Sequence, residues 1–256
     1  MKTGTKVFLG IVGGLLAAVL LLWAIVPTLP VYLLIRHKID PEILNKTLIA
    51  APYTDLEIPS DYQRISERGL SISLPADMKP KETESKSLRA YRSDAGWAII
   101  FINHDDDPEG FQFIGGDGLS QKDYDRFVSA IKREKPATNY DMYHLILNLT
   151  PKDIKLTKHG SWRPILQMMN SKEQLWQSMG REGYPLESEH GIGYYTLYGE
   201  PNGTRKDYRI LVELYDKEDK NRCASAIISA GTLEDAVRIA NSADYDRDYQ
   251  PEDKDE

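Results

Sequence analysis

The longest apolar run of the chain lies near its start, over residues 7–26. It holds 20 residues without a charged or strongly polar side chain. At about 1.5 Å per residue, a helix of this length measures about 30 Å, the thickness of a bilayer's hydrocarbon core. A soluble helix would show a polar face, and this run has none. The pattern predicts a transmembrane helix from Val7 to Val26, with residues 1–6 as a short N-terminal tail.

Prolines mark the end of this predicted helix. Apolar residues continue to Ile35, but Pro27 and Pro30 interrupt them. A proline inside a helix removes a backbone donor and clashes with the preceding turn, so we expect the helix to end or kink near Val26. A cleaved signal peptide is the alternative. Its apolar core usually spans about 7–15 residues, and no small-x-small cleavage site follows this longer run, so an uncleaved signal-anchor is favoured.

Flanking residues bear on how the anchor is placed. Trp23 and Tyr32 are expected at headgroup level, where amphipathic rings collect. Basic residues lie on both sides of the run and are nearly balanced: Lys2 and Lys6 before it, Arg36, Lys38 and Lys46 after it. Long domains translocate largely regardless of flanking charge. We therefore expect a single-pass protein of the cell membrane with an extracytoplasmic domain.

Residues 36–62 predict a juxtamembrane helix and a tether. Asp40 is a favourable N-cap, and Pro41 suits the first position of a helix that we expect to continue to Ala50. Prolines then interrupt regular structure, which predicts a tether that ends at residue 62.

Strands open the next part of the chain, which we predict to be one domain over residues 63–243. Leu70, Ile72 and Leu74 alternate with serines, the period-two pattern of a half-buried strand. The strands predicted in this part are 63–66, 70–74, 87–93 and 97–103. Capping residues then predict helices that start at Ser120, Thr150 and Ser171, the last bounded by Gly180 and Gly183.

The last third of the domain returns to strand. A hairpin is predicted from residues 193–198 and 208–215, because Pro201, Asn202 and Gly203 form a turn signal between them. A third strand covers 223–230, and Thr232 caps a closing helix over 233–241. Residues 244–256 are acidic and predict a disordered tail. This order predicts an α+β fold, in which helices pack on one antiparallel sheet.

Three features of the chain occur together in a known order: the strand at residues 69–75 (Gly-Leu-Ser-Ile-Ser-Leu-Pro), the strand pair around Tyr91 and Trp97, and the meander 194–230 with its following helix. This order resembles the PsbP/Mog1-like α/β sandwich family. Members of that family mostly bind or assist other proteins rather than catalyse reactions. The resemblance therefore implies a binding or accessory role.

Composition narrows the classes of partner. The net charge is −7, which argues against nucleic acid as a partner. The single cysteine, Cys223, excludes an intramolecular disulfide, and we expect it to be a small buried side chain at a strand start. The five histidines show no metal-ligand spacing along the chain. We expect no cofactor, and we expect membrane lipid and another protein as partners.

Two groups of residues are candidate sites. Asp105, Asp106 and Asp107 follow a predicted strand, and clustered carboxylates suit calcium; a solvated loop is the plainer interpretation. Tyrosines gather on the predicted hairpin, where they predict either a binding face or cross-strand packing. These tyrosines are Tyr194, Tyr195, Tyr198, Tyr208 and Tyr215.

No complete catalytic constellation is present in the sequence. We therefore expect a membrane-anchored, non-catalytic binding or accessory module. The alternative is a membrane-anchored hydrolase whose site combines residues distant in sequence, such as His104 with residues 105–107.

Overall fold

A computed structural model of the chain describes most of its residues, and in helix α1 the side chains at 11–22 and 24. The described ranges are 3–25, 29–53, 56–83, 88–104, 121–131, 133–154, 162–180, 182–202 and 206–250. The chain divides into two compact units. Unit one comprises residues 1–46, 117–135 and 149–173, and unit two comprises 47–116, 136–148 and 174–256. The segment 63–243, which the sequence predicted to be one domain, contributes residues to both units.

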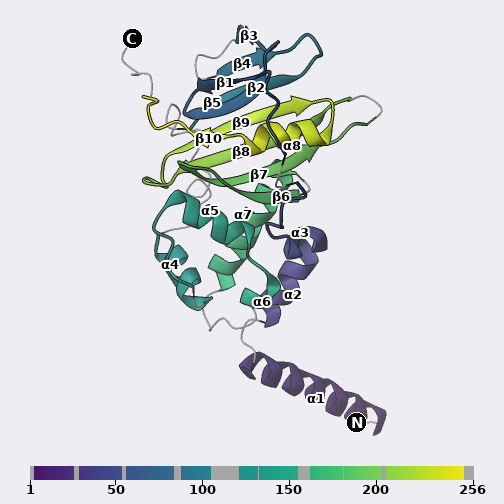
Figure 1. Cartoon of the computed structure of the whole chain (residues 1–256). Coiled ribbons are helices and arrows are strands. Elements are labelled where there is room, and N and C mark those ends of the chain that lie inside the picture. The colour runs from purple at the N-terminus through teal and green to yellow at the C-terminus, as the bar shows by residue number, and fades with distance from the viewer. Residues whose placement is uncertain are drawn as a thin grey trace. The chain divides into compact units, whose positions relative to one another are not determined.

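Unit one is built from helices (Figure 1). They are α1 (Thr3–Ile25), α2 (Leu29–Lys38), α3 (Pro41–Asn45), α4 (Gln121–Ala130), α6 (Pro151–Ile154) and the first part of α7 (Trp162–Met179). The described side chains of α1 include large apolar residues that are exposed, such as Leu15, Leu16 and Val19. Across the part of the chain that the structure describes, no helix is both long enough and apolar enough to cross a membrane. The spanning role of residues 7–26 stays a prediction.

The predicted juxtamembrane helix forms, but it is shorter than expected. The Asp40 side chain accepts a hydrogen bond from the backbone N–H of Glu42, and Pro41 occupies the first turn, as predicted. The helix ends at Asn45 rather than Ala50, because Lys46 adopts an extended backbone. Beyond that point the backbone N–H of Ile49 donates to the carbonyl of Gly183 within unit two.

A buried lysine joins the parts of unit one. Lys172 is fully buried on α7, and its Nζ donates to the carbonyl oxygens of Leu44 (3.3 Å), Lys46 (2.6 Å) and Leu149. Burial lowers the pKa of its ammonium to about 8. Three carbonyl acceptors supply what water would otherwise provide, and a buried charge requires such partners.

Unit two contains two antiparallel sheets. The smaller sheet has the order β1-β2-β10 and the larger the order β3-β4-β5-β9-β8-β7-β6 (Figure 1). The strands are β1 (Tyr62–Glu67), β2 (Leu70–Pro75), β3 (Lys79–Lys81), β4 (Leu88–Arg92), β5 (Ala98–Asn103), β6 (Glu182–Glu187), β7 (Gly191–Gly199), β8 (Tyr208–Asp216), β9 (Cys223–Ala230) and β10 (Asp244–Tyr245). The unit also holds α5 (Asn139–Leu147) and α8 (Leu233–Asn241).

One face of the larger sheet forms the main apolar core. Helix α8 packs against β8, β9 and β2, and Figure 1 shows it lying along β8 and β9. Its buried residues Val237 and Ile239 belong to the same core as alternate side chains of the sheet, including Val212 and Phe101. The α+β prediction, with antiparallel strands and packed helices, is confirmed. The prediction of one sheet is wrong, because β1, β2 and β10 pair as a second sheet.

Several elements differ from the sequence prediction. Ser171 was predicted to start a helix, but it lies inside α7, which runs unbroken from Trp162 to Met179. Its buried residues recur every three or four positions, so the apolar stripe continues through Ser171. Strand β6 was not predicted. It contains Pro185, which an edge strand tolerates because one side of its backbone has no partner strand.

The start of the predicted disordered tail is ordered. Asp244 and Tyr245 form β10, which pairs with β2, and Tyr245 is buried. Arg247 then pairs with Asp216 at 3.0 Å and with Glu218 at 2.8 Å. The disorder prediction is wrong for residues 244–250, because these contacts come from elements distant in sequence. Residues 251–256 lie outside the described residues.

A glycine allows α7 to end against β7. Gly180 has a φ of +108°, and a Cβ there would collide with the backbone of Tyr198. We expect Gly180→Ala to destabilise the protein by about 2–4 kcal/mol, from left-handed strain and overpacking together. Gly96→Ala is the matched control, because Gly96 has a φ of +90° in open space and its variant reports strain alone, about 1–2 kcal/mol. Thermal unfolding of both variants measures the difference, and equal losses would contradict the close approach.

Candidate functional site

The second face of the larger sheet carries polar and ionisable side chains among aliphatic ones such as Leu211 and Ile227. Strand residues alternate between faces, so Glu213 and Tyr215 of β8 lie opposite the apolar Val212 and Leu214. Tyr194 of β7 is the register partner of Glu213, and Ser225 of β9 is its partner on the other side. These side chains are buried. A row of buried polar groups therefore crosses the middle of the sheet.

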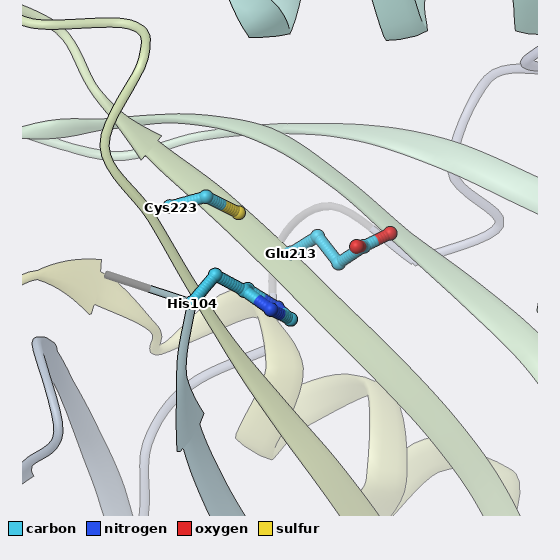
Figure 2. A group of neighbouring side chains, drawn as sticks. All are labelled: His104, Glu213 and Cys223. Carbon is cyan, nitrogen blue, oxygen red and sulfur yellow. The ribbon is translucent and has the colours of Figure 1, made fainter. Parts of the chain in front are cut away.

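His104, Glu213 and Cys223 form a compact cluster on this face. His104 follows the last residue of β5, and its backbone N–H donates to the carbonyl of Cys223 at 3.1 Å. Cys223 opens β9, and Glu213 lies on β8. One ligand atom from each of the three side chains lies within 4.8 Å of the others. Figure 2 shows the three side chains extending to the same side, two from neighbouring strands and His104 from the end of the next one.

The donor set of this cluster is one nitrogen, one sulfur and one carboxylate oxygen. Borderline-soft divalent metals such as zinc accept these three ligand types together, whereas calcium and magnesium prefer oxygen alone. The His104 Nε2 also lies 2.5 Å from the Ser225 hydroxyl, so one ring nitrogen is held in place by a neighbour on β9.

Glu213 is a buried acidic residue with no lysine or arginine paired to it among the described residues. Burial raises the pKa of its carboxyl from 4.5 to about 7, and the hydroxyl of Tyr194 opposes this rise. No lysine or arginine among the described residues forms an ion pair with it. A buried carboxylate in such a place is stabilised either by a proton or by a cation.

Tyrosines enclose the cluster. Tyr140 and Tyr143 of α5 contact the ring of Tyr215, with centroids 5.5 and 6.2 Å away. Burial raises the pKa of the Tyr194 and Tyr215 phenols well above 10, and the negative charge of Glu213 adds to the shift. The hydroxyls of Tyr194 and Tyr215 are buried, and no group in the described part of the chain meets hydrogen-bond geometry with them. These phenols stay neutral and offer polar atoms next to the cluster.

A pocket of about 500 Å³ lies elsewhere in unit two, at the end of the larger sheet that is formed by the edge strand β3 and its neighbours. Its lining includes Lys81, Arg92 and Lys206, with apolar residues such as Ala98 and Ile100 between them. Pockets of about 300–1,000 Å³ with a few convergent polar groups are typical of ligand sites.

The charges of this pocket are unbalanced. Asp207 accepts a hydrogen bond from the Arg209 guanidinium at 2.9 Å and another from the Ser229 hydroxyl, so its charge is already neutralised. Burial acts to raise the pKa of the Asp207 carboxyl, but the hydrogen bonds from Ser229 and Arg209 and the charge of Arg209 hold it below its usual value. No acid in the described part of the chain forms an ion pair with Lys81, Arg92 or Lys206. The pocket presents positive charge above an apolar floor.

The five predicted tyrosines do not form one surface. Tyr194 and Tyr215 lie on the polar face, whereas Tyr195 belongs to the apolar core and packs on Tyr184 with ring centroids 5.0 Å apart. Those three are fully buried, while Tyr198 and Tyr208 are partly buried. Their packing role is therefore evident, and the predicted binding role remains a prediction.

The other predicted site residues have different outcomes. Asp105, Asp106 and Asp107 lie outside the described residues, as do the side chains of Val7 and Trp23 and the whole of Val26. Tyr32 is half-buried on α2, and the Arg36 guanidinium lies 6.0 Å from the centre of its ring.

Sequence reasoning missed the partners of His104. Cys223 was predicted to be buried, which is confirmed, but it was assigned only a packing role. Glu213 was not predicted as a site residue, although it interrupts the otherwise apolar strand sequence ILVELY. An acidic residue within a strand sequence that is otherwise apolar on both faces could have identified Glu213 as a candidate. The sequence could not have identified its neighbours, since only strand pairing brings residues 104, 213 and 223 together.

The chain was compared with known proteins. No protein-family model matches it, and no curated protein matches it significantly.

The raised pKa of Glu213 predicts a pH-dependent stability. Because its folded-state pKa lies above the unfolded value, the stability that the neutral carboxyl contributes is complete below about pH 4.5 and is lost as the pH rises through about 7. In the presence of a chelator, the unaltered protein should lose this stability between pH 5 and pH 8 and Glu213→Gln should not, so the variant should gain about 2.5 kcal/mol on the unaltered protein over that range. Unfolding at both pH values measures this gain.

The control for this prediction is Glu57→Gln, which alters an exposed carboxyl of the same unit. Its effect should be the same at the two pH values. A constant offset between Glu213→Gln and the unaltered protein at pH 5 and pH 8 would show that Glu213 is not desolvated.

Proposed function

We propose that this chain is a single-pass membrane protein whose folded part is a non-catalytic binding or accessory module. The cationic pocket is its binding site. The observation that carries the proposal is the group of three cations, Lys81, Arg92 and Lys206, around an apolar floor in a chain of net charge −7. Cations without counter-ions in an acidic protein favour an anionic ligand.

The occupant that suits this pocket is an acidic segment of another protein. The cations are exposed at the rim, where they pair with carboxylates without a large desolvation cost. The small apolar residues between them, Ala90 and Ala98, leave room for the stem of a glutamate or for an adjacent apolar side chain. The resemblance to the PsbP/Mog1-like family supports the same kind of role.

The membrane anchor rests on the apolar run at residues 7–26. The run of 20 residues matches the thickness of a bilayer core, and residues 7–25 of it lie in helix α1, whose described large side chains are exposed apolar groups. Helix α2 carries Arg36, His37 and Lys38 in its last turn, which suits the polar side of an interface. The folded part is placed outside the cytoplasm because long domains translocate largely regardless of flanking charge.

The anchor predicts how the chain fractionates. We expect the unaltered chain to stay in the membrane pellet after an alkaline carbonate wash, and the double variant Leu16→Arg with Val19→Arg to be released. Each arginine costs about 2.5–3.5 kcal/mol at the centre of a bilayer. The control is Ile49→Arg with Ile58→Arg, which charges two other exposed apolar residues and should leave the chain in the pellet. Release of the unaltered chain would refute the anchor.

A reporter fusion measures on which side of the membrane the folded part lies. A reporter enzyme that is active only outside the cytoplasm, fused to the C-terminus, should be active. A fusion that is stably expressed but silent, with an active cytoplasmic reporter at the same position, would reverse the proposed topology.

The pocket predicts charge-dependent peptide binding. A fluorescent hexaglutamate peptide should bind the full chain, and Lys81→Glu, Arg92→Glu and Lys206→Glu combined should weaken binding about 10-fold or more. Exposed ion pairs contribute about 0.2–1 kcal/mol each, and added salt should reduce the affinity in the same way. Fluorescence anisotropy measures both effects.

The control changes the same net charge elsewhere. Lys122→Glu, Lys152→Glu and Arg163→Glu combined alter exposed residues of unit one and should keep peptide affinity. If both triple variants lose affinity equally, only overall charge matters and the pocket is not the site. If inorganic phosphate competes as well as free hexaglutamate, an acidic protein segment is not the preferred ligand.

A further inference from the structure

We propose that His104, Glu213 and Cys223 together bind a divalent transition-metal ion of the zinc class. Cys223 and Glu213 lie on the neighbouring strands β9 and β8, His104 directly follows the neighbouring strand β5, and the ligand atoms of the three lie within 4.8 Å of one another (Figure 2). This site is separate from the cationic pocket, so it does not depend on the function proposed for that pocket.

Sheet geometry explains why the three residues meet. The pair Asn103 and Ala224 ends the β5–β9 ladder, so the next residue along, His104, lies beside Cys223. Glu213 lies across from Ser225, two residues further along β9 on the same face. Two of the ligands therefore lie on paired strands, and the third, His104, directly follows β5 and is tied to β9 by its backbone hydrogen bond; ligands fixed in this way keep a metal site preorganised.

The chemistry of the donors selects the metal. A thiolate and an imidazole favour zinc and similar borderline-soft ions, and a carboxylate completes a set of the type found in zinc sites. Glu213 and Cys223 are both buried. As a thiolate and a carboxylate they offset the two positive charges of the ion, which is also what a buried carboxylate without a lysine or arginine partner requires.

The surroundings supply a second indication of a ligand. Tyr194 is fully buried, and its hydroxyl lies close enough to Glu213 to act on the pKa of that carboxyl. Its polar neighbours, Glu213 and Tyr215, approach that hydroxyl without full hydrogen-bond geometry. Metal sites are commonly supported by polar groups next to the ligands, and three protein ligands leave a coordination position for water. A metal-bound water at this position would give the Tyr194 hydroxyl a partner.

Cobalt substitution tests the proposal on the full chain. The purified protein is stripped with a chelator and titrated with Co²⁺, which reports thiolate ligation by a charge-transfer absorption band. Because Cys223 is the only cysteine, this band can come from one place alone. We expect saturation at about one equivalent, displacement of the band by Zn²⁺, and a higher midpoint of thermal unfolding with Zn²⁺ than without it.

Variants separate a built site from a lone thiol. Cys223→Ser should abolish the band, and His104→Gln and Glu213→Gln should each weaken Co²⁺ binding by more than about 10–100-fold, the loss that removal of a merely supporting group causes. His190→Gln is the control, because His190 belongs to a different, partly exposed group with Glu189 and Asp244. It should leave the Co²⁺ titration unchanged.

Circular dichroism establishes that each variant is folded before titration. If Cys223→Ser does not fold, the His104→Gln variant still decides, because His104 is only partly buried. The proposal is overturned if the folded, stripped protein shows no charge-transfer band. It is equally overturned if the band and the affinity survive in both His104→Gln and Glu213→Gln, which would mean that Co²⁺ meets the thiol alone.

Discussion

The burial of strands β8 and β9 on both faces is the constraint on which unit two depends. On one face α8 and the small sheet cover aliphatic side chains such as Val212 and Ile228. On the other face, tyrosine rings from β7, β8 and α5 cover Glu213 and Cys223. Over residues 212–216 of β8 and 223–226 of β9, neither face is left to water. Every polar group placed there must consequently find its partner inside the protein.

Two buried ionisable groups meet this constraint in different ways. In unit one the Lys172 ammonium is surrounded by three backbone carbonyls, so its hydrogen-bonding capacity is satisfied by the chain itself. In unit two Glu213 has one tyrosine hydroxyl nearby and no strong base, so its site is completed by a proton or by a cation. The first group holds segments of a helical unit together. The second lies beside His104 and Cys223, with which we propose that it binds a metal ion. Burial of Lys172 therefore points to a structural role, and burial of Glu213 to ligand binding.

Elements with local signals were predicted well. Helix α8 has the predicted bounds and the predicted Thr232 cap, because a cap and an amphipathic stripe are written into consecutive residues. Strand β9 also has its predicted bounds. Strand β6 was missed because its stability comes from pairing with β7, while Gly183 and Pro185 argue locally against a strand. Residues 244–250 were missed for a similar reason, since their partners lie on β2 and β8.

The amino-acid sequence by itself determined the local properties of this protein: an apolar run at residues 7–26, the order of helices and strands in the last third, and a single thiol. These follow from the chemistry of neighbouring residues. The tertiary structure alone decided which side chains meet. Strand order places His104 beside Cys223, and register places Glu213 within reach of both. In the sequence, Glu213 is one of many acidic residues. In the structure its carboxyl is desolvated, because the packed sheet excludes water from both faces of β8 at this position.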